Sequence, residues 1–431
     1  MKSPTREAST KGRLLLLLVG VALLTACLSP PPEQDLPEPV VPKGVENPWR
    51  QDLALLEREL PRRHYDLFHT LTPEEFRGTV RSIDEKAHAL SKEEFEIEVR
   101  KLLASVGDSH TSLDWEPEEL YPLTFGRLKE GIISLSAAQS AMEALSMRLV
   151  AVNGTPIESV RERFARIISY ENEAQLDNRF SQFIRSPMFL RHLGITDDDQ
   201  GARFTFADYQ GGRFTLPVEA VAVDRMPELR SVIDQIGYTR ESAPLYLLNS
   251  GNYYWYEHDA RRQLLYIAYN RCTEDPELPM ESFAGEIRRI LQEGGVEQIV
   301  VDLRRNGGED SRVLQPIIRL LAGEAGSREV YVFIGAGTYS SAVLNAIELE
   351  QEAGAVLVGS ATGGRPNHYG EVRELELPNL GGTVRYSTKY FEMYQGEKGE
   401  QDALYPDIEA PYSLSALVQK RDPAMEAIGL R

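Results

Sequence analysis

The chain has 431 residues, 42% apolar and 26% charged, a composition typical of a soluble globular protein of roughly two to three domains. Its formal net charge of −19 argues against a nucleic-acid partner, because binding phosphates needs a basic surface. The two cysteines, Cys27 and Cys272, are too few for a disulfide framework, and the absence of C-x-x-C and H-E-x-x-H motifs argues against a zinc site. We expect no metal and no cofactor, and we interpret Cys272 as a small buried apolar residue.

Residues 1–27 have the features of a lipoprotein signal peptide. Basic residues precede an apolar run from Leu14 to Leu24, which is too short to span a bilayer as a mature helix. The run ends in L-T-A-C, which resembles a bacterial lipobox, and cleavage there would leave Cys27 as a lipidated N-terminus. An ordinary secretory signal with a chance cysteine is the alternative. We therefore expect a lipoprotein anchored to the membrane of the cell envelope, facing the periplasm or the exterior.

Residues 28–47 are rich in proline and predict an extended tether. Residues 48–118 predict an N-terminal helical domain, in which T-P-E-E at 72–75 and S-K-E-E at 91–94 are capping boxes. The last helix ends at G-D-S-H-T, where a small polar loop holds His110 beside Ser109. Histidine is the side chain best suited to accept a serine proton near neutral pH, whereas a loop histidine without a role is the alternative.

Residues 119–240 predict a mixed α/β region. Residues 148–168 predict a strand, a tight turn and an amphipathic helix, in faint resemblance to the carboxyl half of a PDZ module, although no glycine-rich carboxylate-binding loop is evident. Residues 203–223 alternate like a hairpin.

Residues 241–431 predict an α/β core, because buried strands at 298–303, 330–334 and 355–359 alternate with helices. A Gly307-Gly308 turn follows the first of these strands, and its exposed N–H groups suit an anion or oxyanion site, or a plain tight turn.

Two adjacent serines, Ser340 and Ser341, follow the second strand at the mouth of a predicted helix. Unpaired N–H groups and the helix dipole there favour a serine nucleophile. A helix-capping cluster is the alternative for these serines.

As a set, five motifs resemble the C-terminal (tail-specific) processing peptidase family of serine peptidases. They lie in family order over roughly residues 49–417 and read G-D-S-H-T, D-L-R-R-N-G-G, T-Y-S-S-A, V-G-S-A-T-G-G-R-P-N-H-Y-G-E and L-Y-P-D-I-E-A-P. The resemblance implies a crotonase-like ββα core within residues 241–431, serine peptidase activity, and a peptide or protein substrate.

The resemblance also implies roles for individual residues. The register with the V-G-x-x-T segment selects Ser340 as the nucleophile, with Ser341 and either Gly307 or Gly308 as oxyanion donors. In the best-known branch, a lysine 25 residues after the serine is the base, but Arg365 occupies that position here. A guanidinium stays protonated at any working pH, so Arg365 cannot be a general base.

The tricorn-like branch of the family uses a histidine instead, which implies His110 as the base, oriented by Ser109 and Glu400. Glu397 and Asp402 lie close enough in the sequence to be alternatives to Glu400. Arg365 then binds a substrate carboxylate or braces its loop.

The resulting prediction is a lipid-anchored serine peptidase of the cell envelope. The alternatives are a binding lipoprotein on the same scaffold without proteolytic activity, and a structural lipoprotein in which the serine turn only caps a helix.

A histidine base predicts a characteristic pH profile. Peptidase activity is expected to rise as the pH passes about 6.5, the ordinary pKa of a histidine side chain, because only neutral imidazole accepts a proton. Initial rates measured between pH 5 and pH 10 would show this rise, whereas a rise confined to alkaline pH would indicate a lysine base.

Overall fold

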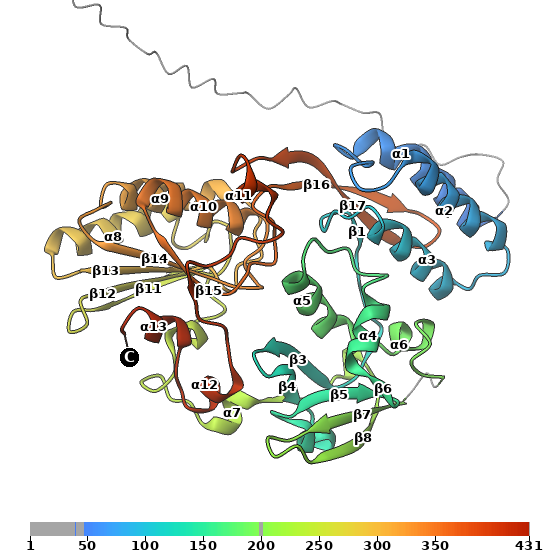
Figure 1. The fold of residues 1–431 in the computed structure, drawn as a ribbon, viewed down its shortest axis with the longest axis horizontal. Coiled ribbons are helices and arrows are strands. Elements are labelled where there is room, and N and C mark those ends of the chain that lie inside the picture. The colour runs from blue at the N-terminus through green and yellow to red at the C-terminus, as the bar shows by residue number, and fades with distance from the viewer. Residues whose placement is uncertain (1–38, 40–46, 198–200, 431) are drawn as a thin grey trace, which may run out of the picture. The chain divides into compact units, whose positions relative to one another are not determined.

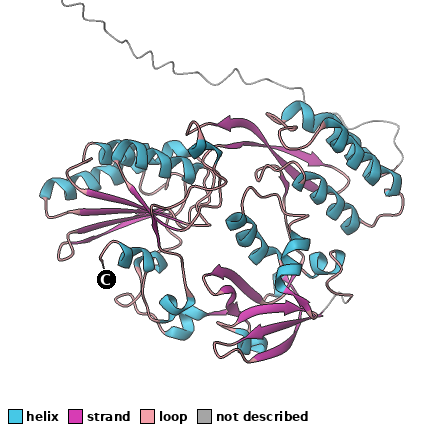
Figure 2. Ribbon diagram, viewed as in Figure 1, coloured by secondary structure: helices cyan, strands magenta, loops and turns pink. Residues whose placement is uncertain are grey.

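The computed structural model describes residues 39, 47–197 and 201–430, so the predicted signal peptide, Cys27 and almost all of the tether lie outside the described residues. Residues 39–431 cluster as one compact unit. Its described part combines an N-terminal helical region with several sheets (Figures 1 and 2), which confirms the expected mixed α/β class. Within these ranges, no helix has the length and apolar character needed to cross a membrane.

The α-helices are α1 (Pro48–Arg63), α2 (Pro73–Lys86), α3 (Lys92–Ala104), α4 (Ile157–Phe164), α5 (Glu173–Phe183), α6 (Pro187–His192), α7 (Val232–Ile236), α8 (Met280–Glu293), α9 (Gln315–Ala322), α10 (Ser341–Ala353), α11 (Glu397–Glu400), α12 (Leu414–Val418) and α13 (Pro423–Ala427). Short 3₁₀ turns are η1 (Gln139–Ala144), η2 (Val223–Arg225), η3 (Leu245–Leu247) and η4 (Ser311–Leu314).

The strands form four sheets. A six-stranded sheet has the order β11 (Tyr254–Asp259), β12 (Leu264–Tyr269), β13 (Gln298–Asp302), β14 (Glu329–Ile334), β15 (Val356–Gly359), β18 (Ile408–Glu409). A seven-stranded sheet has the order β10 (Arg230–Ser231), β4 (Gly131–Ala137), β5 (Arg148–Val152), β7 (Gly201–Ala207), β8 (Arg213–Glu219), with β3 (Leu123–Leu128) on β4 and β6 (Thr155–Pro156) on β5. The smaller sheets are β1 (Ser112–Leu113), β17 (Gly382–Phe391), β16 (His368–Leu377), and the pair β2 (Glu119–Leu120), β9 (Val221–Ala222).

Helices α2 and α3 begin where the capping signals predict them, and α1 precedes them. The Thr72 and Ser91 side chains each accept a hydrogen bond from the N3 backbone N–H. In return, the Glu75 and Glu94 carboxylates accept one from the N-cap backbone N–H, so both capping boxes are confirmed. The apolar faces of these helices pack against the long β16–β17 hairpin, so residues far apart in the chain share one core. The hairpin, which the sequence analysis did not single out, therefore ties the C-terminal region to the N-terminal helices.

The six-stranded sheet positions the site. From β12 to β18 its strands are parallel, and β11 pairs antiparallel at one edge. Alternate residues of β13 enter opposite cores: Ile299 and Val301 pack toward α8, α9 and α10, and Val300 packs toward α13. Both faces are covered, as parallel sheets require (Figure 1). The free thiol of Cys272 is fully buried in this core, as predicted.

A buried ion cluster attaches the C-terminal segment to this sheet. Arg304 donates from both terminal nitrogens to Asp422, at 2.9 Å each, and from Nε to Asp302 at 3.0 Å. Asp422 also accepts a bond from the Ala424 N–H at the start of α13. Because the charges are removed from water, each partner must be satisfied by another.

We therefore expect Asp422→Ala to lower the free energy of unfolding by about 3 kcal/mol, since it removes a bidentate partner of a buried guanidinium and a helix cap. Urea denaturation checks this. Glu293→Ala, which breaks the exposed pair with Arg289, is the control and should cost less than about 1 kcal/mol. Equal costs for the two variants would contradict a structural role for the cluster.

Candidate active site

The two glycine- and serine-rich loops predicted from the sequence lie side by side. Strands β13 and β14 are parallel neighbours, so the loops that follow them leave the same edge of the sheet. The Thr338 hydroxyl donates to the Leu303 carbonyl at 2.9 Å, and the Tyr339 N–H donates to the Asn306 carbonyl at 3.0 Å. These bonds hold the serine turn against the Gly307-Gly308 turn.

Ser340 occupies a strained backbone conformation. It has φ 52° and ψ −127°, a combination that side chains with a Cβ rarely adopt, and it immediately precedes the 13-residue helix α10. No side-chain capping bond is made from this position, which argues against the capping alternative. Such strain costs about 1–3 kcal/mol, and it is characteristic of a nucleophile presented on a sharp strand-to-helix turn.

The Gly307-Gly308 turn packs directly against Ser340. Gly308 has φ +100°, and a Cβ there would lie 2.8 Å from the Cβ of Ser340 and 3.0 Å from the N of Ser341. The Gly308 N–H already donates to Asn306 Oδ1 at 3.0 Å. Among the described residues, the N–H groups of Gly307, Ser340 and Ser341 have no hydrogen-bond partner, so those of Gly307 and Ser341 remain candidate donors to an oxyanion.

The loop that carries His110 is organised by the buried carboxylate of Asp108. Oδ1 of Asp108 accepts from the His110 N–H at 2.9 Å. Oδ2 accepts from Thr111 at 2.6 Å and Ser387 at 2.7 Å, and pairs with Nε2 of His64 at 3.0 Å. Although burial opposes it, the neighbouring side chains of His110 and His64 hold the pKa of Asp108 well below its usual range.

A second buried carboxylate, that of Glu171, lies beside this loop. It follows α4 and immediately precedes the N-cap of α5, and only 3% of its side chain is exposed. Oε1 accepts from the Ser109 hydroxyl at 2.7 Å, and Oε2 accepts from the Arg365 N–H at 3.2 Å. Burial raises the pKa of Glu171. The Ser109 oxygen also lies 2.7 Å from the Tyr339 hydroxyl, which links the histidine loop to the residue before Ser340.

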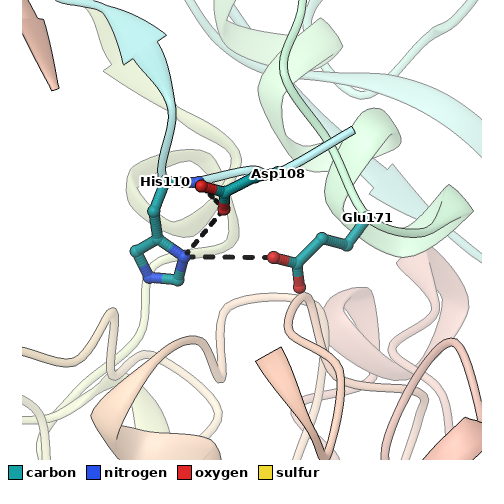
Figure 3. Close-up of side chains that lie close together, drawn as sticks. All are labelled: Asp108, His110 and Glu171. Atoms are coloured by element: carbon teal, nitrogen blue, oxygen red, sulfur yellow. Dashed lines mark hydrogen bonds and ion pairs between the residues drawn. The ribbon is translucent and has the colours of Figure 1, made fainter. Parts of the chain in front are cut away.

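The imidazole of His110 is enclosed but has no hydrogen bond. Its ring stacks on Tyr339 at 4.6 Å and on His368 at 5.6 Å between centroids. Nδ1 points toward two carboxylates, at 3.8 Å from Asp108 Oδ1 and 3.9 Å from Glu171 Oε1 (Figure 3). Within the described part of the chain, neither ring nitrogen has a hydrogen-bond partner. Burial and the charge of His110 lower the pKa of His368 to about 4, so His368 is neutral at physiological pH.

The structure packs Gly308 against Ser340 and places Ser109 and His110 against the neighbouring Tyr339, but it does not place Glu400 against His110. Glu400 is exposed at the end of α11 and lies outside ion-pair distance of the imidazole. Ser109 contacts Glu171 instead of the His110 ring. Glu171 was missed by the sequence reasoning because it belongs to no recognised motif.

Arg365 and Glu400 line a common pocket of about 440 Å³. Glu171, His368 and Tyr390 also line it. A second pocket of about 420 Å³ is lined by Ser109, His110 and Tyr339, among other residues. Glu171 therefore lines the first pocket and His110 lines the second, and each pocket is large enough for a side chain.

No protein-family model and no curated protein matches this sequence. Among solved structures, mature CPAF complexed with lactacystin is similar, with a TM-score of 0.62 and 14% identity, covering 89% of this chain and 97% of that chain. Another structure of mature CPAF has a TM-score of 0.61 and 15% identity, with coverages of 86% and 94%. The photosystem II D1 C-terminal processing protease has a TM-score of 0.42 and 14% identity, with coverages of 86% and 96%. The CPAF structures, with TM-scores above 0.6, show a shared fold and confirm the expected resemblance at that level.

The packing of Gly308 generates a prediction about the serine turn. Gly308→Ala is expected to destabilise the protein by about 1–3 kcal/mol, because the new Cβ would meet the Ser340 Cβ and nearby backbone atoms at a positive φ. Gly307→Ala is the matched control, since a Cβ there meets nothing within 4 Å. Thermal unfolding of both variants tests this, and similar melting temperatures would contradict the packing.

Proposed function

We propose that the protein is a serine peptidase in which Ser340 is the nucleophile and His110 is the general base. The observation that carries the proposal is the strained Ser340 at the N-terminus of α10, with the free N–H groups of Gly307 and Ser341 beside it. The shared fold with CPAF supports the same conclusion. A binding protein would have no need to maintain a strained serine with unpaired backbone donors.

In this mechanism, the Ser340 oxygen attacks the peptide carbonyl carbon while Nε2 of His110 accepts the hydroxyl proton. The carbonyl oxygen becomes an oxyanion, which the Gly307 and Ser341 N–H groups stabilise. The C–N bond then breaks as His110 returns the proton to the leaving amine. Water, deprotonated by the same imidazole, hydrolyses the acyl-enzyme. In the free protein Ser340 and His110 are not hydrogen-bonded, and the bond forms when substrate is bound.

The carboxylates of Asp108 and Glu171 orient the imidazole in this proposal. Both face Nδ1, so the neutral tautomer that keeps its proton on Nδ1 is favoured, and Nε2 is left as the acceptor. Their negative charges also stabilise the imidazolium that forms after proton transfer. Ser109 holds Glu171 in place.

The pocket beside Glu171 is the proposed site for part of the peptide substrate. Arg365 lines it, and its guanidinium can pair with a substrate carboxylate. Anchoring through a lipid on Cys27 places this activity at the cell envelope, as the lipobox-like segment predicts.

Labelling with a fluorophosphonate tests the nucleophile. The wild-type full-length chain is expected to be labelled, whereas Ser340→Ala should lose labelling and at least about 10³-fold of its peptidase rate. Ser341→Ala is the matched control, because it keeps the backbone N–H and loses only a bond to the Glu309 carbonyl. Undiminished labelling of Ser340→Ala would falsify the assignment, and a wild type that binds peptide but is never labelled would favour the binding lipoprotein.

Isosteric variants distinguish the carboxylates that could orient His110. Glu171→Gln is expected to lower kcat by at least about tenfold with little change in KM, because the charge facing the imidazolium is lost. Glu400→Gln should have a smaller effect on kcat, since Glu400 does not reach the ring. Steady-state kinetics on a peptide substrate measures both constants, and the reverse order of effects would assign the role to Glu400.

A further inference from the structure

We infer that His110, Asp108 and Glu171 form an inhibitory site for a zinc-class divalent cation. The inference rests on the proposed function for its regulatory meaning, but the metal site itself follows from geometry. One nitrogen and two carboxylate oxygens, one from each of these residues, all lie within 4.8 Å of one another, and Figure 3 shows Nδ1 directed between the carboxylates.

The distances suit a metal with short bonds. Nδ1 lies 3.8 Å and 3.9 Å from the two facing oxygens. Zinc bonds of about 2.0–2.1 Å at a tetrahedral angle place neighbouring ligand atoms about 3.4 Å apart, so each nitrogen-to-oxygen distance would shorten by about half an ångström on binding. The two carboxylate oxygens lie within 4.8 Å of each other and would also move together. Imidazole nitrogen and carboxylate oxygen are both zinc ligand types, and three protein ligands leave a fourth tetrahedral position for water.

The facing atoms have lone pairs to spare. Oδ1 of Asp108 and Oε1 of Glu171 each accept one side-chain or backbone hydrogen bond, which leaves a further lone pair on each. Only 6% of the His110 side chain is exposed, and neither ring nitrogen is hydrogen-bonded to any described residue. An unpartnered, buried nitrogen aimed at two carboxylates is the independent sign of a ligand.

Neighbouring groups hold the ligands in place. Oδ2 of Asp108 is held by His64, Thr111 and Ser387, and the outer oxygen of Glu171 is held by the Arg365 N–H. Such supporting bonds orient metal ligands and raise affinity. A dication would also offset the negative charge of two buried carboxylates, which have only the imidazoles of His64 and His110 beside them as ion-pair partners.

Metal binding and catalysis exclude one another at this imidazole. A metal on Nδ1 uses the lone pair of that nitrogen, so the ring proton must be on Nε2. Nε2 is the nitrogen left for Ser340, and once protonated it cannot accept the serine proton. Zinc therefore inhibits by fixing the wrong tautomer, without contacting Ser340.

The experiment uses chelator-treated full-length protein and Zn²⁺ alone as the probe. Competition with a chromophoric zinc indicator measures binding, and fluorophosphonate labelling at increasing Zn²⁺ measures inhibition. The wild type is expected to bind zinc, and Glu171→Gln should bind it at least about tenfold more weakly. Labelling of the wild type should decrease as zinc is added and recover when a chelator removes it. Glu392→Gln is the control, because this exposed carboxylate lines the pocket next to Glu171. Equal zinc affinity in wild type and Glu171→Gln would overturn the site.

The two proposals fail separately. Labelling that zinc does not affect, in a protein that binds no zinc, overturns the metal site and leaves the peptidase assignment intact. Zinc binding that depends on Glu171 in a protein that is never labelled supports the metal site and overturns the peptidase. Circular dichroism of Glu171→Gln confirms that the variant is folded in either case, and a cobalt-substituted wild type should show the intense visible bands of four-coordinate cobalt.

Discussion

The arrangement of the site depends on one buried charge, the carboxylate of Asp108. An ionised group removed from water is tolerated only when every oxygen is satisfied, because an unpaired buried charge costs several kcal/mol. Here the donors come from three distant parts of the chain: His64 at the end of α1, Ser387 in β17, and the loop of His110 itself. Satisfying Asp108 therefore joins the helical region, the hairpin and the histidine loop, and fixes the direction in which His110 emerges.

The turn that carries Ser340 is held by a different kind of constraint. Parallel pairing of β13 with β14 brings two loops to one sheet edge, and close packing of Gly308 on Ser340 supports a backbone conformation that would otherwise relax. Tyr339 connects this turn to the histidine loop through its ring and its hydroxyl. The proposed base and the proposed nucleophile are thus positioned by separate parts of the chain that meet at Tyr339.

Carboxylates around a histidine have two chemical uses that depend on the same geometry. They stabilise an imidazolium during proton transfer, and they complete a ligand set for a divalent cation. The choice between these uses is a choice of tautomer at His110. Burial of Glu171 strengthens both interactions, because a buried carboxylate is stabilised more by a nearby positive charge than an exposed one is. Inhibition by metal would then be a direct consequence of the arrangement that favours catalysis.

Local signals in the sequence determined much of this description. Capping boxes predicted α2 and α3, short apolar runs predicted the buried strands, and neighbouring small residues marked the turns at Gly307 and Ser340. Each of these features is decided by contacts within a few residues. Motif order carried the resemblance that the fold comparison confirms. Only the tertiary structure decided which carboxylates face His110. Glu171 lies in a loop with no motif and reaches the imidazole through the packing of α4 and α5, and Glu400, favoured by spacing, remains outside ion-pair distance. Burial by distant parts of the chain, which no local pattern encodes, distinguishes the Glu171 carboxylate beside His110 from the exposed Glu400 carboxylate.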